Sequence, residues 1–432
     1  MSWFAVYFPL VLEERRRRKP RTEIFNRQKR ELMSRTGQLR SWITAIGRRV
    51  VSSALVLGFV FMSTALLPSL ARAQTYTVLY TFQGTPDGGG PRSGLIRDGK
   101  GNLYGTTWSG GTFNDGVVFK VDKTGKETVL HSFDSADGAQ PWAAVVRDSA
   151  GNLYGTTYNG GISGCGVVFK LDTLGTLTRL YNFTCGADGS NPRASLVRDS
   201  AGNLYGTTIF GGASGKGTVF KVDATGVETV LYSFTDGVDG GYPWAGLVRD
   251  AAGNLYGTTV SGGTGTEGVV FKVDKTGKET VLHSFVGGSD GMFPASGNLF
   301  RDSAGNLYGV TPQGGTPGFG VIYRVDKAGN ESVLYTFTGQ LDGGTSISGL
   351  VHDTAGNLYG TTNFSPGSGG NPGYGGIFEL SLSGLLSVLY AFPGGADGQP
   401  TYATLLRDSA GHLYGTTYTS NPGQGVAFKF TP

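Results

Sequence analysis

From about residue 75 onward, the chain is a succession of short apolar runs separated by turn-forming residues. In the first full unit these runs are 93–97 (SGLIR), 102–107 (NLYGTT), 117–121 (VVFKV) and 128–133 (TVLHSF). They are rich in Val, Leu, Phe, Tyr and Thr, which favour strands. Asp-x-x-Gly connections between them suit tight hairpins, because Asp bonds its own turn and Gly accepts a positive φ. The pattern predicts four antiparallel strands per unit.

The motif G-N-L-Y-G recurs at intervals of 50 to 55 residues. A fixed period of this length indicates a repeat architecture. Four antiparallel strands repeated seven times predict an all-β fold, a seven-bladed β-propeller over residues 74–432. The motif copies begin at Gly101, Gly151, Gly202, Gly253, Gly305 and Gly356 and, as GHLYG, at Gly411.

The last unit ends one strand short. It stops at 426–430 (VAFKF), and no fourth strand follows. Residues 77–82 (TVLYTF) precede the first unit and match the fourth strand of all the others. We therefore expect the N-terminal strand to complete the last blade, which would close the ring and remove its open sheet edge.

Several repeated residues are interpreted as structural. Positions equivalent to Leu95, Leu103, Phe119 and Phe133 are apolar in nearly every unit and should fill the space between blades. The Tyr of the motif occurs in all seven units, and a specific site would not need seven copies. An Arg-Asp pair ends the first strand of each unit except the sixth, where His352 replaces Arg with no obvious partner.

Composition supports this fold and locates the charge. Gly accounts for 74 of 432 residues, which suits many short strands joined by turns. Residues 1–73 carry a net charge of +10; since the whole chain carries +4, the remainder carries −6. Nucleic-acid binding requires clustered Lys and Arg, so we expect no nucleic-acid partner.

Residues 1–73 have the features of an N-terminal extension with a secretory signal peptide. The apolar stretch 50–67 follows Arg48 and Arg49, and Ala71-Arg72-Ala73 forms an A-x-A cleavage pattern. Translation from Met33 would shorten the long basic region. The alternative is an uncleaved anchor, since 18 apolar residues can just span a bilayer. The sequence predicts export to the periplasm, the cell surface or the medium, with membrane contact only if the segment is uncleaved.

The order G-N-L-Y-G-T-T, Gly-Gly, G-V-V-F-K and V-L-Y-x-F resembles the GloVer tandem repeat of exported bacterial proteins. The resemblance covers residues 76–430. It implies an exported repeat protein, and it transfers neither an activity nor functional residues.

Cys165 and Cys185 are the only cysteines. Cys165 immediately precedes the third strand of the second unit, and Cys185 follows the fourth. Because these ends meet in an antiparallel hairpin, the spacing predicts a disulfide, in agreement with an oxidising compartment.

One position in the connections between units varies more than its surroundings. If it faces the central opening, Trp and Tyr could stack on sugar rings and Arg could pair with carboxylates; the alternative is packing between blades. Around the ring it is Arg92, Trp142, Arg193, Trp244, Ala295, Ile347 and Tyr402. The candidate ligand-binding residues are Arg92, Trp142, Arg193, Trp244 and Tyr402. The next loop of several units opens with Trp108, Tyr158, Ile209, Val260 and Tyr418.

The same connections each carry Asp-Gly. Seven carboxylates on one face are compatible with calcium, but Asp-Gly is also ordinary turn chemistry, which is the favoured interpretation. We therefore expect no cofactor, with calcium as the alternative. The seven residues are Asp87, Asp137, Asp188, Asp239, Asp290, Asp342 and Asp397.

Two functional hypotheses remain. The first is an exported, non-catalytic binding module, monomeric, whose ligand is a glycan or a partner protein at the variable-loop face. The second is a propeller enzyme, a hydrolase, lyase or lactonase with possible metal assistance, acting on extracellular substrates. The sequence contains no nucleophile elbow, no H-E-x-x-H and no phosphate loop, so the enzyme hypothesis rests on fold analogy alone.

Overall fold

A computed structural model describes residues 74–432, except 295–296, 347, 364, 367–371, 401–402 and 422. The predicted signal peptide and its cleavage site lie outside the described residues. Within the described part, no helix is long and apolar enough to cross a membrane.

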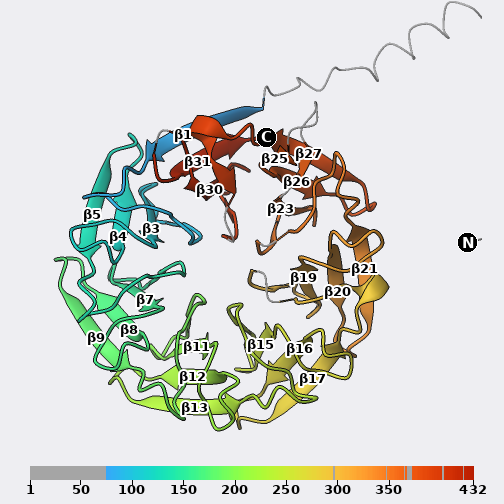
Figure 1. Cartoon of the computed structure of the whole chain (residues 1–432), viewed down its shortest axis with the longest axis horizontal. Coiled ribbons are helices and arrows are strands. Elements are labelled where there is room, and N and C mark those ends of the chain that lie inside the picture. Colours follow the sequence, from blue (N-terminus) through green and yellow to red (C-terminus); the bar gives the residue numbers. More distant parts are fainter. Residues whose placement is uncertain are drawn as a thin grey trace, which may run out of the picture. The chain divides into compact units, whose positions relative to one another are not determined.

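Seven four-stranded antiparallel sheets are arranged around a central opening as the blades of a propeller, which confirms the predicted fold (Figure 1). Each blade has its shortest strand innermost. In order around the ring, the blades are β2 (Ile96–Arg97), β3 (Leu103–Thr107), β4 (Val117–Val121), β5 (Glu127–Ser132); β6 (Val146–Arg147), β7 (Leu153–Thr157), β8 (Val167–Leu171), β9 (Leu177–Asn182); β10 (Val197–Arg198), β11 (Leu204–Thr208), β12 (Thr218–Val222), β13 (Glu228–Ser233); β14 (Val248–Arg249), β15 (Leu255–Thr258), β16 (Val269–Val273), β17 (Glu279–Ser284); β18 (Phe300–Arg301), β19 (Leu307–Thr311), β20 (Val321–Val325), β21 (Glu331–Thr336); β22 (Val351–His352), β23 (Leu358–Thr362), β26 (Gly376–Leu380), β27 (Leu386–Ala391); and β29 (Leu406–Arg407), β30 (Leu413–Thr419), β31 (Val426–Thr431), β1 (Thr75–Thr81).

A few short elements lie outside this scheme. They are β24 (Ser365–Pro366), which pairs with β25 (Pro372–Gly373), then β28 (Gln399–Pro400) beside β30, and the 3-10 turns η1 (Gly288–Asp290) and η2 (Gly395–Asp397).

The N-terminal strand closes the ring as predicted. β1 pairs antiparallel with β31, from Thr75 opposite Thr431 to Thr81 opposite Val426. The seventh blade is therefore built from both ends of the propeller sequence, and its outer edge is the first strand of the fold (Figure 1).

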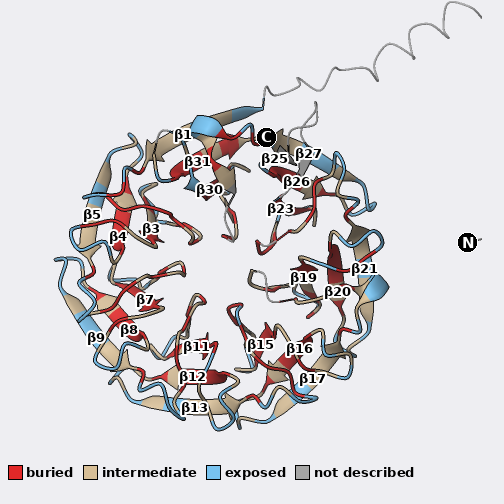
Figure 2. Ribbon diagram, in the orientation of Figure 1, coloured by how far each residue is buried: buried red, intermediate tan, exposed pale blue. Residues whose placement is uncertain are grey.

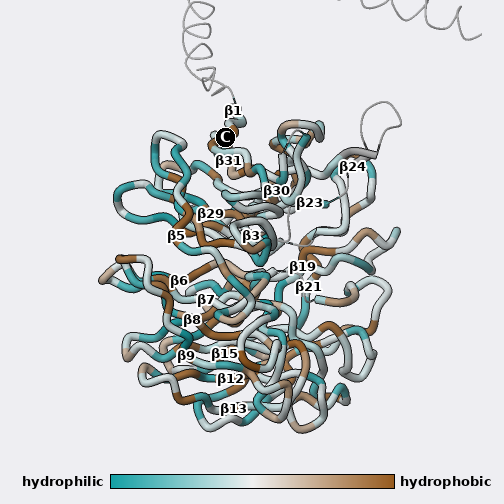
Figure 3. Tube along the Cα trace, turned by 60° about the vertical axis from the view of Figure 1, so that its left-hand side comes forward, coloured by the Kyte–Doolittle hydropathy of each residue, from teal (hydrophilic) through white to brown (hydrophobic). Residues whose placement is uncertain are grey.

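The core is divided among the seams between blades. At every seam a Phe that follows the outer strand of one blade packs edge-on against the aromatic ring in the third strand of the next. Phe133 and Phe169 form one such pair, with ring centres 5.3 Å apart, and both are fully buried. In Figure 2 the third strands of the blades, such as β4, β8 and β12, are coloured mainly as buried. Burial of each ring stabilises the fold by roughly 1.5–3 kcal/mol. In Figure 3, hydrophobic stretches run through the stacked blades and hydrophilic ones occupy their loops.

The second Gly of the repeated motif is required by this packing. A Cβ on Gly105 would lie 2.7 Å from the ring of Phe119 in the neighbouring strand, closer than real Cβ atoms approach. The glycine of the motif thus makes room for the aromatic ring of its own blade.

The repeated Tyr, Asp and Arg form a belt around the ring, which supports their structural interpretation. In the first blade the Tyr104 hydroxyl donates to Asp98 at 3.1 Å, and Arg147 of the next blade lies over the Tyr104 ring at 6.0 Å. The sixth blade differs because His352 stacks on Phe300 of the fifth, with ring centres 4.2 Å apart. His352 therefore does have a partner, on the neighbouring blade.

The innermost strand is shorter than predicted. Residues 93–97 were expected to be extended and paired, but only Ile96–Arg97 belong to the sheet. Ser93 Oγ instead accepts a hydrogen bond from the Thr106 backbone N–H at 3.0 Å and donates one to the Thr106 carbonyl at 3.1 Å. A side chain here takes the place of the backbone ladder.

Candidate functional site

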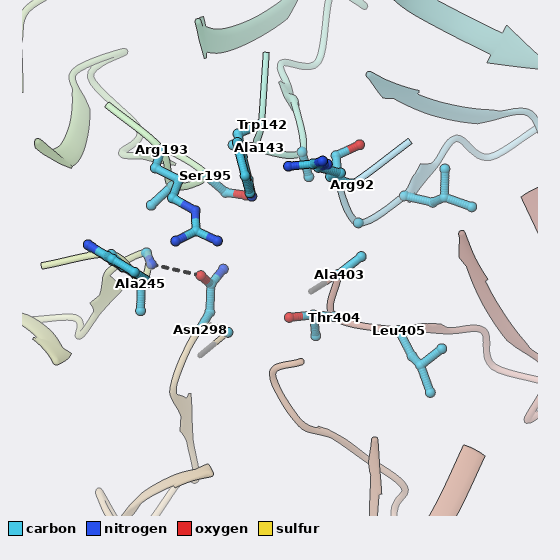
Figure 4. A pocket seen from close by; sticks show the side chains of 18 residues that line it. Arg92, Trp142, Ala143, Arg193, Ser195, Ala245, Asn298, Ala403, Thr404 and Leu405 are labelled. Atoms are coloured by element: carbon cyan, nitrogen blue, oxygen red, sulfur yellow. Dashed lines mark hydrogen bonds between the residues drawn. The ribbon is translucent and has the colours of Figure 1, made fainter. Parts of the chain in front are cut away.

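A cavity of about 220 Å³ lies where the inner ends of six blades converge, and we call it the mouth. The chain enters each blade there through the connection that contains the variable position. Four of the five candidate ligand-binding residues line the mouth: Arg92, Trp142, Arg193 and Trp244. The first three are labelled in Figure 4. We call these four side chains, from four successive blades, the wall. Tyr402, Ala295 and Ile347 lie outside the described residues.

The wall is an alternating stack of guanidinium groups and indole rings. Arg92 lies 4.5 Å and Arg193 4.3 Å from the ring centre of Trp142. Arg193 also lies 4.5 Å from the ring centre of Trp244. In Figure 4, Trp142 stands edge-on between the two guanidinium groups. Each cation–π contact contributes about 0.5–2 kcal/mol, so the stack holds both arginines in place.

Residues from the following loops support the wall from behind. Trp108 packs edge-on against Trp142, with ring centres 4.7 Å apart. Arg92 lies 4.8 Å from the ring centre of Trp108 and 5.0 Å from that of Tyr418. The guanidinium of Arg92 is thus surrounded by three aromatic rings and belongs to the frame of the mouth.

The two tryptophans of the wall therefore differ. Trp142 has a guanidinium on either side, so neither face is available to a sugar ring, and packing accounts for its contacts. Trp244 lies at the end of the stack and is 40 % exposed. Of the two rings it presents more surface to solvent, since Trp142 is only partly exposed.

The bottom of the mouth contains polar side chains that the sequence analysis missed. They directly precede the residue equivalent to Leu95 in their blades, at a position where the other blades have Gly or Ala. Ser195, Asn298 and Thr404 occupy this position in three blades, and we call them the floor. Asn298 Oδ1 accepts from the Gly246 backbone N–H at 2.9 Å, and its amide nitrogen points toward the opening (Figure 4). Polar residues at a position otherwise held by Gly or Ala were the signal that could have revealed them.

The mouth carries positive charge. Its described lining contains two arginines and no Asp or Glu. The residues at 295, 296, 347, 401 and 402, which lie outside the described part, are Ala, Ser, Ile, Thr and Tyr in the sequence. The residues after the leader carry a net charge of −6, so the mouth is a local exception.

The Asp-Gly carboxylates are held within their own loops. Asp87 accepts from the Tyr80 hydroxyl at 2.6 Å and from the Gln83 backbone N–H at 3.1 Å. Equivalent Tyr–Asp bonds connect Tyr181 to Asp188, Tyr232 to Asp239, Tyr335 to Asp342 and Tyr390 to Asp397. These contacts are the turn chemistry expected of Asp-Gly. Across the described residues, no three His, Cys, Asp or Glu side chains come together as a metal site.

In two blades a His stands where the others have the Tyr that bonds to the Asp of the Asp-Gly loop: His131 on β5 and His283 on β17. His131 Nε2 lies 2.7 Å from Asp137, and His283 Nε2 lies 3.7 Å from Asp290. Burial lowers the pKa of His283 below its usual value, although the charge of Asp290 opposes this shift. Both histidines lie at the outer strands, away from the mouth.

The predicted disulfide is confirmed. Cys165 and Cys185 are bonded, with Cα atoms 5.5 Å apart, and tie the start of β8 to the loop after β9. The bond is consistent with an oxidising compartment.

The chain belongs to the Gloeobacter/Verrucomicrobia repeat family, whose model matches residues 65–264 and 246–432. This confirms the resemblance found in the repeats. No curated protein matches.

Among solved structures, a gluconolactonase of Xanthomonas campestris is 14% identical, with 73% of this chain and 90% of that chain covered and a TM-score of 0.41. A second protein, named as a candidate gluconolactonase, is 12% identical, with 74% of this chain and 94% of that chain covered and a TM-score of 0.40. Both similarities are too distant to bear on activity.

Proposed function

We propose that this protein is an exported binding module whose ligand, a glycan or a segment of a partner protein, enters the mouth. One observation carries the proposal: the position that varies most among the repeats is the one that forms the wall. Packing alone would not require this position to differ from blade to blade, yet it is Arg, Trp, Arg and Trp in four successive blades. All four side chains line the same cavity. Variable residues on a rigid frame are a common basis of recognition.

The chemistry of the mouth suits binding. The wall offers guanidinium groups and an exposed indole, and the floor offers hydroxyl and amide groups. Together they can stack on a ring and hydrogen-bond to its substituents. Export is supported by the disulfide and by the signal-peptide pattern of the leader.

The test is binding of the full chain to a broad glycan panel, with and without calcium. Trp244→Ala should lose binding and keep the melting temperature, because Trp244 is exposed. Trp142→Ala, the matched control, should lower the melting temperature, because both sides of this ring are packed. Binding that Trp244→Ala leaves intact would overturn the mouth as the site. Turnover of any panel member would favour an enzyme instead.

A further inference from the structure

We propose that the end of the ring opposite the mouth rests on an anionic phospholipid membrane, which leaves the mouth turned away from the bilayer. This inference goes beyond the proposed function and does not depend on what the mouth binds. It follows from three features of the turns at that end: where they lie, which residues they exclude and which side chains they expose.

The antiparallel order of the strands places two sets of turns at the same end of every blade. The turn between the first and second strands and the turn between the third and fourth lie at one end, and the connections that line the mouth lie at the other. In the first blade these turns are residues 98–101 and 122–126. We call this end of the ring the turn face. β1, the first strand after the leader, also begins there, because Thr75 is the counterpart of Lys126.

The variable positions of the turn face exclude acidic residues. Six blades have a turn between their third and fourth strands, and its second, third and fifth positions vary. These eighteen positions hold Lys, Leu, Thr, Ala, Val, Asn and Ser, and never Asp or Glu. The loops at the mouth end do contain acidic residues outside their Asp-Gly pairs, such as Asp115, Asp236 and Glu267. Exposed positions under no constraint would include acidic side chains too, so the turn face avoids negative charge.

Lysine is concentrated on the turn face. Ten of the twelve lysines after residue 73 lie in these turns or within two residues of them. Six of the ten are exposed, and across the described ranges none of the six forms an ion pair. Their ammonium groups are therefore available to an anionic surface. The six are Lys100, Lys123, Lys126, Lys275, Lys278 and Lys327.

The acidic groups of the turns are held close to the backbone. Asp122 Oδ1 accepts hydrogen bonds from two backbone N–H groups of its own turn, at 2.8 and 3.0 Å. Burial, followed by the charge of Asp87, raises the pKa of Glu127, the residue after this turn, to about 7. Glu127 therefore carries only part of a negative charge at neutral pH. The charge that reaches furthest from the turn comes from its two lysines.

Aliphatic side chains occupy the same turn positions in other blades. In the sixth blade Leu382 stands where the first has Lys123, and Leu385 where it has Lys126; they are 78 % and 67 % exposed. Leu174, in the second blade, is 90 % exposed. Lys and Leu side by side suit the surface of a bilayer, where apolar side chains enter the acyl boundary and ammonium groups meet lipid phosphates. A soluble acidic polymer would account for the lysines and not for the leucines.

The experiment measures co-sedimentation of residues 74–432 with two kinds of vesicle. All seven blades pair within residues 75–431, so this segment contains the complete propeller, and it lacks the basic leader, which would bind anionic lipid by itself. One vesicle is phosphatidylcholine, and in the other about one third of it is replaced by phosphatidylglycerol. We expect binding to the mixed vesicle to be at least about tenfold tighter and to weaken as salt is added.

A pair of charge variants localises the contact. Lys123→Gln/Lys126→Gln should weaken binding to the mixed vesicles about tenfold, because it removes two charges from the turn face. Thr112→Glu/Ser163→Glu is the matched control: it changes the net charge by the same amount at exposed positions of the mouth-end loops, and should change binding little. Melting curves establish that each protein is folded.

A second pair tests the aliphatic contribution. Leu382→Ser/Leu385→Ser should also weaken binding about tenfold, because two apolar side chains no longer enter the lipid. Ile162→Ser/Leu341→Ser removes two aliphatic side chains of similar exposure, 80 % and 79 %, from the mouth-end loops and should leave binding unchanged.

The outcomes separate the alternatives. Equal binding to both vesicles, or binding to neither, would overturn the membrane proposal and leave binding at the mouth untouched. Equal weakening by the lysine variant and by its glutamate control would show an effect of net charge and refute the turn face as the contact. Weakening by the lysine variant with none by the Leu382→Ser/Leu385→Ser variant would refute contact with lipid in favour of a soluble anionic polymer.

Discussion

Tyr76 stacks face to face on Tyr390, with ring centres 4.5 Å apart and ring planes within 3° of each other. Tyr76 lies on β1, the outer strand of the seventh blade, and Tyr390 lies on β27, the outer strand of the sixth. The Tyr76 hydroxyl also donates to the Asp397 carbonyl at 3.2 Å. The closing strand is thus held by its neighbouring blade as well as by backbone pairing.

We expect deletion of residues 74–83 to lower the melting temperature sharply, because it removes the outer strand of one blade and exposes β31. Tyr76→Ala alone should cost about 3 kcal/mol, as for other large aromatic truncations. Chemical denaturation measures both effects. Leu174→Ala, at a side chain that is 90 % exposed, is the control and should be neutral. An unchanged melting temperature in the deletion would refute closure by the first strand.

Stability should fall as the pH rises through neutrality. Burial, followed by the charge of Asp87, raises the pKa of Glu127 to about 7. The same two causes, with a different Asp, raise the pKa of three equivalent glutamates to about 7: Glu228, Glu279 and Glu331. A raised carboxyl pKa contributes stability that is fully present below the unfolded value, near 4.5, and is lost as the pH rises through 7.

The check is a series of melting curves from pH 5 to 8.5 for the native chain and for a variant with all four glutamates changed to Gln. The native protein should lose melting temperature across this range. The variant should lose less, since Gln does not ionise. Parallel curves for the two proteins would show that these glutamates do not govern the pH dependence.

The disulfide should stabilise the second blade. Cys165 and Cys185 are 20 residues apart, and a loop of this length corresponds to about 3 kcal/mol in the chain-entropy account. Cys165→Ser/Cys185→Ser should lower the free energy of unfolding by about that amount. A reducing agent should destabilise the native chain and leave the double variant unaffected, which separates loss of the bond from effects of the substitutions.

The sixth blade allows a compensation test. Phe300 stacks between His352 and Tyr308, in the place where Arg meets Tyr at the other seams. His352→Arg or Phe300→Val alone should therefore destabilise the fold. The pair together restores the common arrangement, and a double-mutant cycle should give a coupling of about 0.5–1.5 kcal/mol. Additive effects would mean that the two rings do not depend on each other.

The sequence was sufficient for the fold because each prediction rested on a pattern repeated seven times. The blade order, the closing strand and the buried Phe positions follow from that pattern. Contacts between different blades were harder to predict. The guanidinium groups on either side of Trp142 come from the first and third blades, and their directions depend on the radius of the ring.

The floor was missed for a related reason. Asn298 follows an additional residue at the start of the fifth unit, so alignment on the preceding Pro placed Ala295 at the variable position and left Asn298 unexamined. The partner of His352 was also hidden, because Phe300 is only one more apolar residue in a strand. The contact made by a residue that departs from the repeat, such as His352, can be identified only when the position of the neighbouring blade is known.

The pairing of β1 with β31 also determines when, during synthesis, the ring can close. β1 is synthesised before the other strands of the propeller, and its partner β31 is synthesised after all of them. Until then the growing protein is an open arc with an unpaired strand edge at its last blade, which can pair with another copy of itself. Closure of the ring and protection of this strand edge are thus the same event, and a propeller that lacks β1 or β31 would never reach it.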